Sequence, residues 1–197
     1  MTTIDKPSPS NITAVILAGG ASTRMGRDKA LLEWRDRPFI AHIIARLQPQ
    51  VAHIAINTNN AAEFEQFGLP LIGDATAKRC GPLGGVLAAL NYSATAWTLI
   101  VPCDNPLLST QLVARLAESI HVNASDVAYA ASKDDSHYLY ALLRASLRDS
   151  LAHFMNGSDY AVRHWYASLR TSRVDFSDAA ECFRNINNVD DLTQLPR

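Results

Sequence analysis

A glycine-rich loop followed by basic side chains is the first feature of the sequence that could do chemistry. Residues 14–32 read AVILAGGASTRMGRDKALL, in which an apolar run stops at Gly19 and Gly20. Because these glycines lack Cβ atoms, peptide N–H groups can approach a phosphate or a base closely. Arg24 and Lys29 would supply the positive charge that a triphosphate requires. The loop has neither the Walker A pattern nor G-x-G-x-x-G, so it predicts a phosphate-binding loop of another kind, with an ordinary strand-to-helix loop as the alternative.

A carboxylate ends the most apolar strand expected in the chain. The segment VPCDNP places Asp104 at the end of residues 97–104, and Asn105 and Pro106 then interrupt the extended run. In a parallel sheet this position faces the crevice at the strand ends, where the glycine loop also lies. Mg²⁺ typically binds one or two protein carboxylates and completes its octahedron with water and phosphate oxygens. Asp104 is therefore a candidate magnesium ligand, with capping of the following turn as the alternative.

A second carboxylate occurs beside a cluster of glycines in LIGDATAKRCGPLGGVLAAL, residues 71–90. Asp74 ends an expected strand, and the three glycines that follow allow close backbone approach where the next helix begins. Asn57 ends its own strand in the same way. Tight packing of helix on sheet explains the glycines equally well, and asparagine is common in turns.

Short strands alternate with helices, which predicts an α/β fold with a mostly parallel sheet covered on both faces. Pro38 is well placed for the first turn of one helix, and Ser109 is well placed to cap another. Helices are expected at 39–47, 81–93, 109–120, 147–155, 161–169 and 189–195. Strands are expected at 14–18, 51–57, 69–74, 97–104, 126–131, 137–143, 173–176 and 181–187, with a hairpin across 133–136.

Length and composition limit the function classes. The 197 residues fit one domain, expected at 12–197 after a flexible tail at 1–11. A net charge of −1 provides no overall positive field for nucleic acid, so any anion site must be local. The spacing of the three cysteines suits neither zinc nor a disulfide framework. The chain has no run of about 18 apolar residues that could span a membrane, so a cytoplasmic protein is expected.

Four segments, taken together and in this order, resemble the molybdenum cofactor guanylyltransferases: LAGGASTRMGRDKALL, GDATAKRCGPLGGVLAAL, VPCDNP and RNINNVDDL. The likeness runs from about residue 12 to residue 195. The first segment reads LAGG and not LAAG, and in this it resembles the guanylyl branch of the superfamily rather than the cytidylyl branch. The resemblance implies a Rossmann-like three-layer nucleotidyltransferase fold with a mostly parallel, mixed central sheet. It also implies the reaction of GTP with molybdopterin, which yields the guanine dinucleotide form of the cofactor and pyrophosphate.

The resemblance further implies roles for individual residues. Those that would bind the nucleotide are Leu17, Ala18, Gly19, Gly20, Lys29, Asn57, Asp74, Gly84 and Asp104. Those that would act in catalysis are Arg24, Lys29 and Asp104, of which Asp104 would also bind Mg²⁺. Asn185 and Asn187 match the N-x-N of the family and would lie on the pterin side. Molybdopterin-synthesis or insertion proteins and apo-molybdoenzymes would be protein partners.

The implied chemistry needs no protein nucleophile, because the phosphate of the acceptor is already anionic, and positioning and charge stabilisation would suffice.

The sequence departs from the family at Tyr138, Asn188 and Val189, and it carries a single basic residue, Arg163, where the family often has more. These departures lie in the pterin-facing half. Transfer of another nucleotide such as CMP, transfer to another acceptor such as a sugar phosphate, and non-catalytic delivery of the cofactor are the alternatives.

Overall fold

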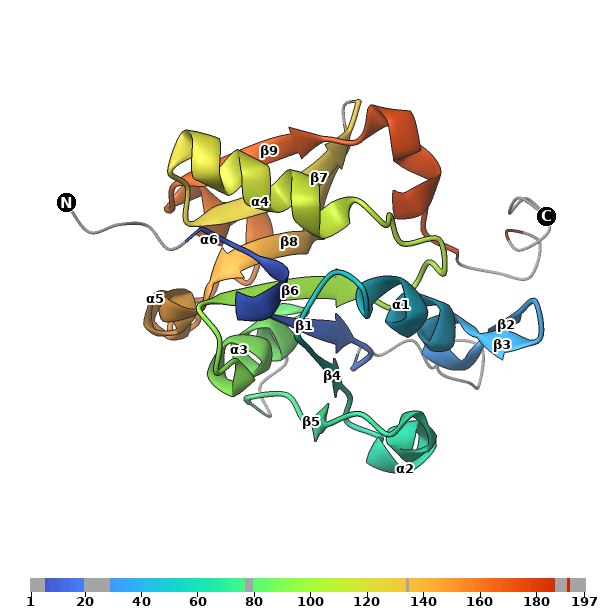
Figure 1. The fold of residues 1–197 in the computed structure, drawn as a ribbon. Helices are drawn as coiled ribbons and strands as arrows, with labels where there is room; N and C mark the ends of the chain where they lie inside the picture. Colours follow the sequence, from blue (N-terminus) through green and yellow to red (C-terminus); the bar gives the residue numbers. More distant parts are fainter. Residues whose placement is uncertain (1–5, 20–28, 77–79, 134, 187–190, 192–197) are drawn as a thin grey trace.

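A seven-stranded sheet of order β5-β4-β1-β6-β8-β7-β9 forms the centre of the molecule in a computed structural model (Figure 1). The structure describes residues 6–19, 29–76, 80–133, 135–186 and 191. Strand β8 runs antiparallel to both of its neighbours, and the other pairs are parallel. The strands are β1 (Ile12–Leu17), β4 (His53–Asn57), β5 (Leu71–Ile72), β6 (Trp97–Pro102), β7 (Val127–Ser132), β8 (Asp135–Arg144) and β9 (Thr171–Asp175). The expected mostly parallel, mixed sheet is confirmed.

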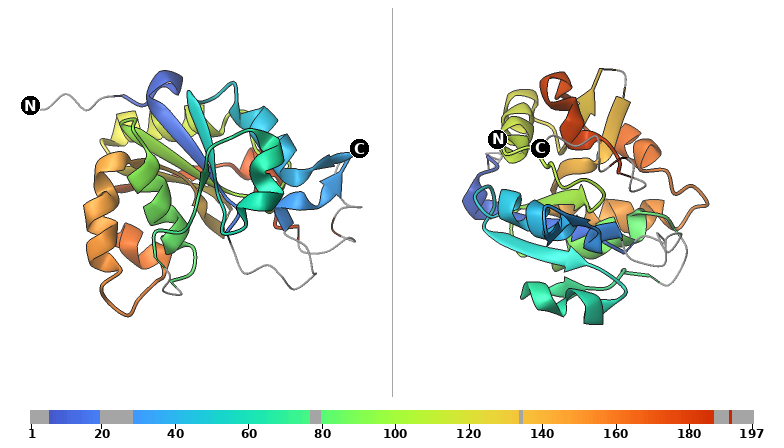
Figure 2. Two further views of the ribbon diagram at one scale, coloured as in Figure 1. Left: turned by 90° about the horizontal axis from the view of Figure 1, so that it is seen from below. Right: turned by 90° about the vertical axis from the view of Figure 1, so that its right-hand side faces the viewer.

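Helices cover both faces of this sheet, because successive side chains of a strand point to opposite sides. Ala14 and Ile16 of β1 pack in one core cluster and Val15 packs in the other. The first cluster includes residues of α1 (Phe39–Leu47) and α4 (Leu112–Asn123), which lie on one face (Figures 1 and 2). The second includes residues of α3 (Leu83–Tyr92), α5 (Arg148–Phe154) and α6 (Val162–Ala167) on the other face. The three-layer architecture follows from this alternation.

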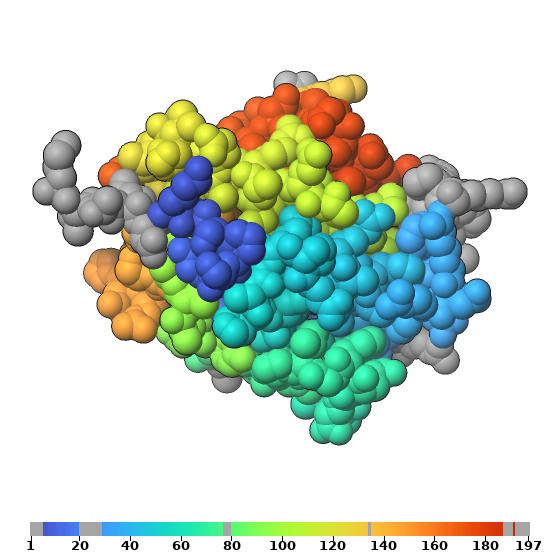
Figure 3. All heavy atoms as spheres, viewed as in Figure 1, coloured from blue at the N-terminus to red at the C-terminus, as the bar shows by residue number. Residues whose placement is uncertain are grey.

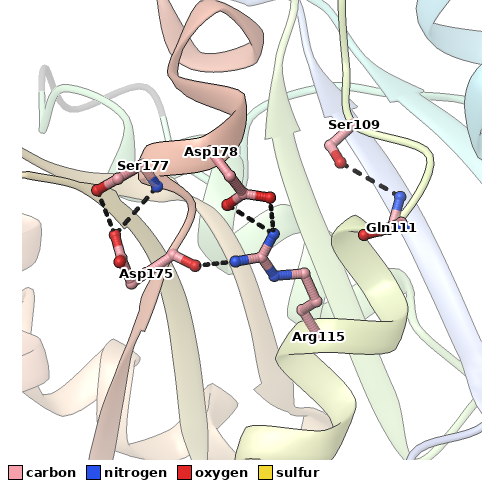
Figure 4. Close-up of polar contacts among 6 residues, drawn as sticks. All are labelled: Ser109, Gln111, Arg115, Asp175, Ser177 and Asp178. Carbon is pink, nitrogen blue, oxygen red and sulfur yellow. Dashed lines mark hydrogen bonds and ion pairs between the residues drawn. The ribbon is translucent and has the colours of Figure 1, made fainter.

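Most elements agree with the sequence analysis. Helix α1 occupies the expected residues and begins directly after Pro38, whose φ of −58° suits a helix start. Helix α4 begins three residues later than expected. The reason is a turn in which the Ser109 hydroxyl accepts a hydrogen bond from the backbone N–H of Gln111 at 3.2 Å (Figure 4). The hairpin of β7 and β8 is present, and β8 is longer than expected.

The expected strand at 181–187 is wrong for the residues that the structure describes. Residues Ser177–Phe183 form a 3₁₀ helix, η6, and residues 184–186 follow it. Arg115 of α4 holds the start of this helix by donating to both carboxylate oxygens of Asp178, at 3.0 and 2.9 Å, and to the carbonyl of Asp175 (Figure 4). These side-chain contacts tie the segment to α4, and the alternation of side chains does not reveal them. Of the closing helix expected at 189–195, only Asp191 falls among the described residues.

Several short elements complete the fold. Strands β2 (Glu33–Trp34) and β3 (Arg37–Pro38) form an unexpected hairpin. Its turn residues, Arg35 and Asp36, have φ values of 51° and 57°, as a type I′ turn requires. The remaining short helices are η1 (Pro9–Asn11), η3 (Lys29–Leu31), α2 (Ala61–Phe64), η4 (Glu65–Phe67) and η5 (Ala145–Leu147).

The second half of the expected N-terminal tail lies against the domain. Pro7 is buried, and Lys6 forms an ion pair with Glu118 of α4 at 3.4 Å. In Figure 3 the blue spheres of residues 6–11 lie against the yellow-green surface of α4. Residues 1–5 lie outside the described residues. Among the helices that the structure describes, none is long and apolar enough to cross a membrane.

Candidate active site

Four parallel strands end side by side at one edge of the sheet. Leu17, the last residue of β1, pairs in register with Asn57 of β4 and with Pro102 of β6. Asn57 pairs in turn with Ile72, the last residue of β5. Ligands of open α/β sheets bind beyond such carboxyl ends, where the loops converge.

A cavity of about 320 Å³ lies at this edge. It is lined by residues from the strand ends and from the start of α3: Leu17, Gly19, Asn57, Asp74, Gly81, Pro82, Gly85, Pro102 and Leu139. Four of the residues expected to bind a nucleotide are thus brought to one cavity. Ala18 is buried beside it, and its backbone N–H donates to the Asn57 carbonyl at 2.8 Å. The structure brings these residues together, and their role in binding a nucleotide stays a prediction.

An amide–carboxylate network forms the polar wall of this first cavity. The buried Asn57 donates from Nδ2 to the Ile72 carbonyl at 3.2 Å and to Asp74 Oδ1 at 3.1 Å. Asn59 donates from Nδ2 to Asp74 Oδ2 at 3.0 Å and accepts from the Asp74 backbone N–H at 3.1 Å. Both carboxylate oxygens of Asp74 are therefore oriented by side-chain amides. Asn59 is not among the residues expected from the sequence, although its place two residues after a strand-ending asparagine was a usable signal.

Glycines let helix α3 approach this network. A Cβ atom on Gly85 would lie 2.4 Å from Asn57 Oδ1, closer than real side chains come. Gly19 is less restricted, since its added Cβ would lie 3.3 Å from the same oxygen. Gly84 does not line the first cavity, and its added Cβ would lie 3.3 Å from Cys80 Sγ and 3.6 Å from Asp74 Cγ. Gly85, rather than Gly84, is the glycine whose lack of a side chain shapes the cavity.

Asp104 lies just beyond β6 in a partly buried position. Burial raises the pKa of its carboxyl, while its own backbone N–H, the charge of Lys29 and a hydrogen bond from Tyr140 oppose this change. The Tyr140 hydroxyl donates to Asp104 Oδ1 at 3.4 Å, and burial keeps the pKa of that tyrosine far above its ordinary value, so it stays a donor. Because the charge of Lys29 lowers the pKa of Asp104, the side chain of Lys29, expected to belong to the phosphate loop, lies near this carboxylate. A desolvated carboxylate with one long side-chain hydrogen bond is stabilised by a nearby cation.

A second cavity, of about 590 Å³, adjoins the first, since Pro82, Pro102 and Leu139 line both. Asp104 and Asn185 lie on its wall. The other lining residues come from β8 and from the start of α6: Ser136, His137, Tyr138, Tyr140, Tyr160, Ala161, Val162 and Arg163. Asp104 therefore lies in the second cavity, close to its boundary with the first. Asn185, which the N-x-N resemblance assigns to the pterin, lies on the wall of the same cavity.

Two polar groups of the second cavity are held by neighbours. His137 stacks on Phe183, with ring centroids 4.9 Å apart, and its Nε2 is 2.7 Å from Ser132 Oγ. Burial lowers the pKa of His137, so it is less readily protonated than an exposed histidine. Arg163 donates from Nε to His164 Nε2 at 3.1 Å.

Three expected site residues, Gly20, Arg24 and Asn187, lie outside the described residues. Within the described ranges, no group of three or more histidine, cysteine, aspartate or glutamate side chains could hold a metal ion. Tyr140, like Asn59, is not among the residues expected from the sequence. Its hydrogen bond to Asp104 joins β8 to the residues just after the neighbouring strand β6. No local pattern in the sequence predicts that these two strands pair.

A family model and known proteins match this chain over most of its length. The model of the MobA-like NTP transferase domain matches residues 14–174. The molybdenum cofactor guanylyltransferase of Shewanella putrefaciens is 39% identical over 189 residues, which cover 95% of this chain and 97% of that protein. The protein of the same name from Cupriavidus necator is 41% identical over 189 residues, with coverage of 92% and 94%.

Solved structures show the same fold at lower sequence identity. Molybdopterin-guanine dinucleotide biosynthesis protein A from Archaeoglobus fulgidus superimposes with a TM-score of 0.74 at 17% identity, covering 92% of this chain and 95% of that one. A nucleotidyl transferase from Methanothermobacter thermautotrophicus gives a TM-score of 0.70 at 20% identity, with coverage of 93% and 94%. The family match and the curated relatives decide the assignment: the chain belongs to the MobA-like NTP transferase family, among the molybdenum cofactor guanylyltransferases.

Proposed function

We propose that this protein transfers GMP from GTP to molybdopterin, forming the molybdopterin guanine dinucleotide cofactor and releasing pyrophosphate. The observation that carries the proposal is the pair of adjoining cavities, with Asp104 on the wall of the second and the nucleotide-type residues around the first. Relatives with about 40% identity carry the name molybdenum cofactor guanylyltransferase. One cavity for each substrate is what a two-substrate transfer requires.

The nucleoside of GTP would occupy the first cavity. Leu17 and Gly19 offer an apolar surface and accessible backbone for guanine and ribose. Asp74, fixed by Asn57 and Asn59, presents a carboxylate that can accept hydrogen bonds from N–H or O–H groups of the nucleoside. The triphosphate would extend toward Lys29 and Asp104. Gly20 and Arg24 would complete the phosphate loop.

Asp104 fits a magnesium ion. Mg²⁺ needs only one or two protein carboxylates, because water and phosphate oxygens fill its other positions. Asp104 is largely desolvated, and this raises its pKa and leaves a negative charge that a cation would stabilise. When bound there, Mg²⁺ would withdraw charge from the reacting phosphoryl group.

The reaction requires that a phosphate oxygen of the acceptor be aligned with the α-phosphorus of GTP. A phosphate oxygen of the acceptor attacks the α-phosphorus of GTP, and a new P–O bond forms. The bond from the α-phosphorus to the bridging oxygen breaks, and pyrophosphate leaves with that electron pair. Lys29 would offset charge that gathers on the leaving group, together with backbone N–H groups of the glycine loop.

Molybdopterin would occupy the second cavity. Asn185 lies on its wall with Asp104, and the aromatic side chains of Tyr138 and Tyr160 can contact a pterin ring. Arg163, on the wall of the same cavity, would meet an anionic group of the acceptor. Asn187 would act beside Asn185, and apo-molybdoenzymes would receive the product.

Isotope transfer tests the proposed function. Purified protein is incubated with Mg²⁺, molybdenum-loaded molybdopterin and GTP labelled at either the α- or the γ-phosphate. We expect the α-label in a pterin dinucleotide and the γ-label in pyrophosphate. A pterin product without the α-label, or no pterin product, would contradict the proposal.

A further inference from the structure

The segment of residues 177–186, which carries Asn185, is attached to the loop after β6 through a buried side chain, that of Asn105. Asn105 is 1% exposed. Its Nδ2 donates to the carbonyls of Glu181 at 2.8 Å and Arg184 at 2.9 Å. Its Oδ1 accepts from the backbone N–H of Leu107 at 2.7 Å. The side chain thus joins residues that lie more than 70 positions apart in the sequence.

These bonds fix the backbone on both sides of Asn185. The Arg184 carbonyl belongs to the peptide group before Asn185, and Asn105 holds it. The Ile186 N–H belongs to the peptide group after Asn185, and it donates to the Asp104 carbonyl at 3.1 Å. Because φ and ψ of Asn185 lie between two planar peptide groups, fixing both groups restricts the direction of its side chain.

Packing supports the same attachment. Ile186 is fully buried in a small cluster with Leu107 and Phe39. Leu107 therefore contacts the segment through its side chain while its N–H is bonded to Asn105. At its other end, the segment is held by Arg115 on Asp178 (Figure 4).

We propose that Asn105 is a positioning residue that sets the distance between the carboxylate of Asp104 and the acceptor-side residue Asn185. This inference rests on the proposed function, since it assigns the two residues to the nucleotide and acceptor sides of one transfer. Asp104 and Asn185 line the same cavity, and Asn105 joins the backbones that carry them. A misplacement of about 1 Å between reacting groups can lower a rate by roughly 100-fold.

Asn105→Ser is the test variant, because serine can still accept from the Leu107 N–H but is too short to reach Glu181 and Arg184. The matched control is Gln50→Ala. Gln50 is also a buried amide with two bonds to carbonyls, of Arg46 and Ser109, and one from a backbone N–H, but it does not contact the Asn185 segment. A general loss of stability affects both variants.

Kinetics separate positioning from stability. We expect Asn105→Ser to lower kcat/KM for molybdopterin by roughly 30- to 100-fold, with GTP affinity measured without acceptor unchanged within about twofold. Gln50→Ala should leave both values within about twofold of the unsubstituted protein. In an Asn185→Ala background, Asn105→Ser should have little further effect, because it acts through that residue. Additive losses, or an equal loss of GTP affinity, would overturn the proposal.

Amide hydrogen exchange tests the attachment without any assay of transfer. We expect the Ile186 N–H to exchange at least tenfold faster in Asn105→Ser than in Gln50→Ala. Unchanged exchange would refute the positioning role even if GMP transfer is established. Conversely, faster exchange in a protein that does not transfer GMP would refute the proposed function alone. Should Asn105→Ser not fold, Asn105→Thr, which also keeps an acceptor for the Leu107 N–H and fills more of the space left by the amide, takes its place in the same measurements.

Discussion

Gly85 of helix α3 faces Asn57 of strand β4 so closely that a Cβ atom at residue 85 would lie 2.4 Å from Asn57 Oδ1. The same asparagine holds Asp74 through Nδ2. A side chain at residue 85 would therefore displace the amide that orients the carboxylate of the first cavity. The position of helix α3 and the geometry of the proposed nucleoside site depend on one missing methyl group.

Gly85→Ala should therefore weaken nucleotide binding. We expect the dissociation constant of GTP to rise by about tenfold or more and the free energy of unfolding to fall by roughly 1–3 kcal/mol, because a buried amide must move. Isothermal titration and denaturant unfolding measure the two effects.

Gly84→Ala is the comparison: residue 84 was also expected to bind the nucleotide, but Asn57 is not among the nearest atoms to its added Cβ. It gains the same helix propensity, and its Cβ would meet the Cys80 and Asp74 side chains at 3.3 and 3.6 Å, distances that small shifts can relieve. Its effect should be much smaller. Equal effects of the two substitutions would show that the contact with Asn57 is not what shapes the cavity.

Asn59→Ala tests the orientation of Asp74. The substitution removes two hydrogen bonds to that residue, one to its carboxylate and one from its N–H. We expect affinity for GTP and for guanosine to fall together by roughly tenfold, about the loss of one well-oriented hydrogen bond from the nucleoside to Asp74. Asn123→Ala is the control, because it removes an amide that bonds Ser119 near the end of α4. A loss for GTP alone would place Asp74 on the phosphates instead of the nucleoside.

Lys29→Ala should distinguish the triphosphate from the nucleoside. The residue lies near Asp104, where a triphosphate would arrive, so we expect a loss of GTP affinity of about tenfold or more and almost no change for guanosine. Competition binding with the two ligands measures the difference. Equal losses for both would show that Lys29 does not contact phosphate.

Asp104→Asn should remove activity and add stability. Burial raises the pKa of Asp104 in the folded protein above that of the unfolded chain, so the folded state binds the proton more tightly. The free energy of unfolding therefore decreases as pH rises from the ordinary aspartate pKa through the raised one, and this destabilisation is complete above the raised pKa. Asparagine carries no charge and can still accept from Tyr140. We expect GMP transfer to fall by roughly 100-fold or more as the cation ligand is lost.

Thermal unfolding at several pH values measures the stability change, without nucleotide or added Mg²⁺. At pH 7 the variant should unfold at a higher temperature, by roughly 2–4 °C for each kcal/mol gained. The advantage should shrink as pH falls through the raised pKa toward the ordinary aspartate value. A variant that is less stable at pH 7 would mean that the charge of Asp104 is already well compensated in the folded protein.

Local patterns in the sequence were sufficient for the sheet and for much of the candidate site. The strands expected at 14–18, 51–57 and 97–104 are present as β1, β4 and β6, and parallel pairing brings their ends together. Contacts between distant segments could not be predicted in this way. Asn105 reads as a turn residue, yet it holds residues 181–184 from across the fold. For the same reason residues 181–183, which end the helix η6, were expected to begin a strand, since contacts with Arg115 and Asn105 determine the course of this segment.

The glycines show a similar limit. Their spacing predicted close approach at the start of helix α3, but only the packed structure shows that Gly85 meets Asn57 while Gly84 meets Cys80. Which of two adjacent glycines faces the cavity depends on how helix α3 is rotated about its axis. Packing against the whole sheet sets that rotation.

Pyrophosphate release with molybdenum-loaded molybdopterin and Mg²⁺, compared among GTP, CTP and ATP, tests the central claim most directly. We expect release with GTP, in equal amount to the pterin dinucleotide formed, and none above background with CTP or ATP. Release with CTP in place of GTP, or no release with any of the three by protein that binds GTP, would contradict the account.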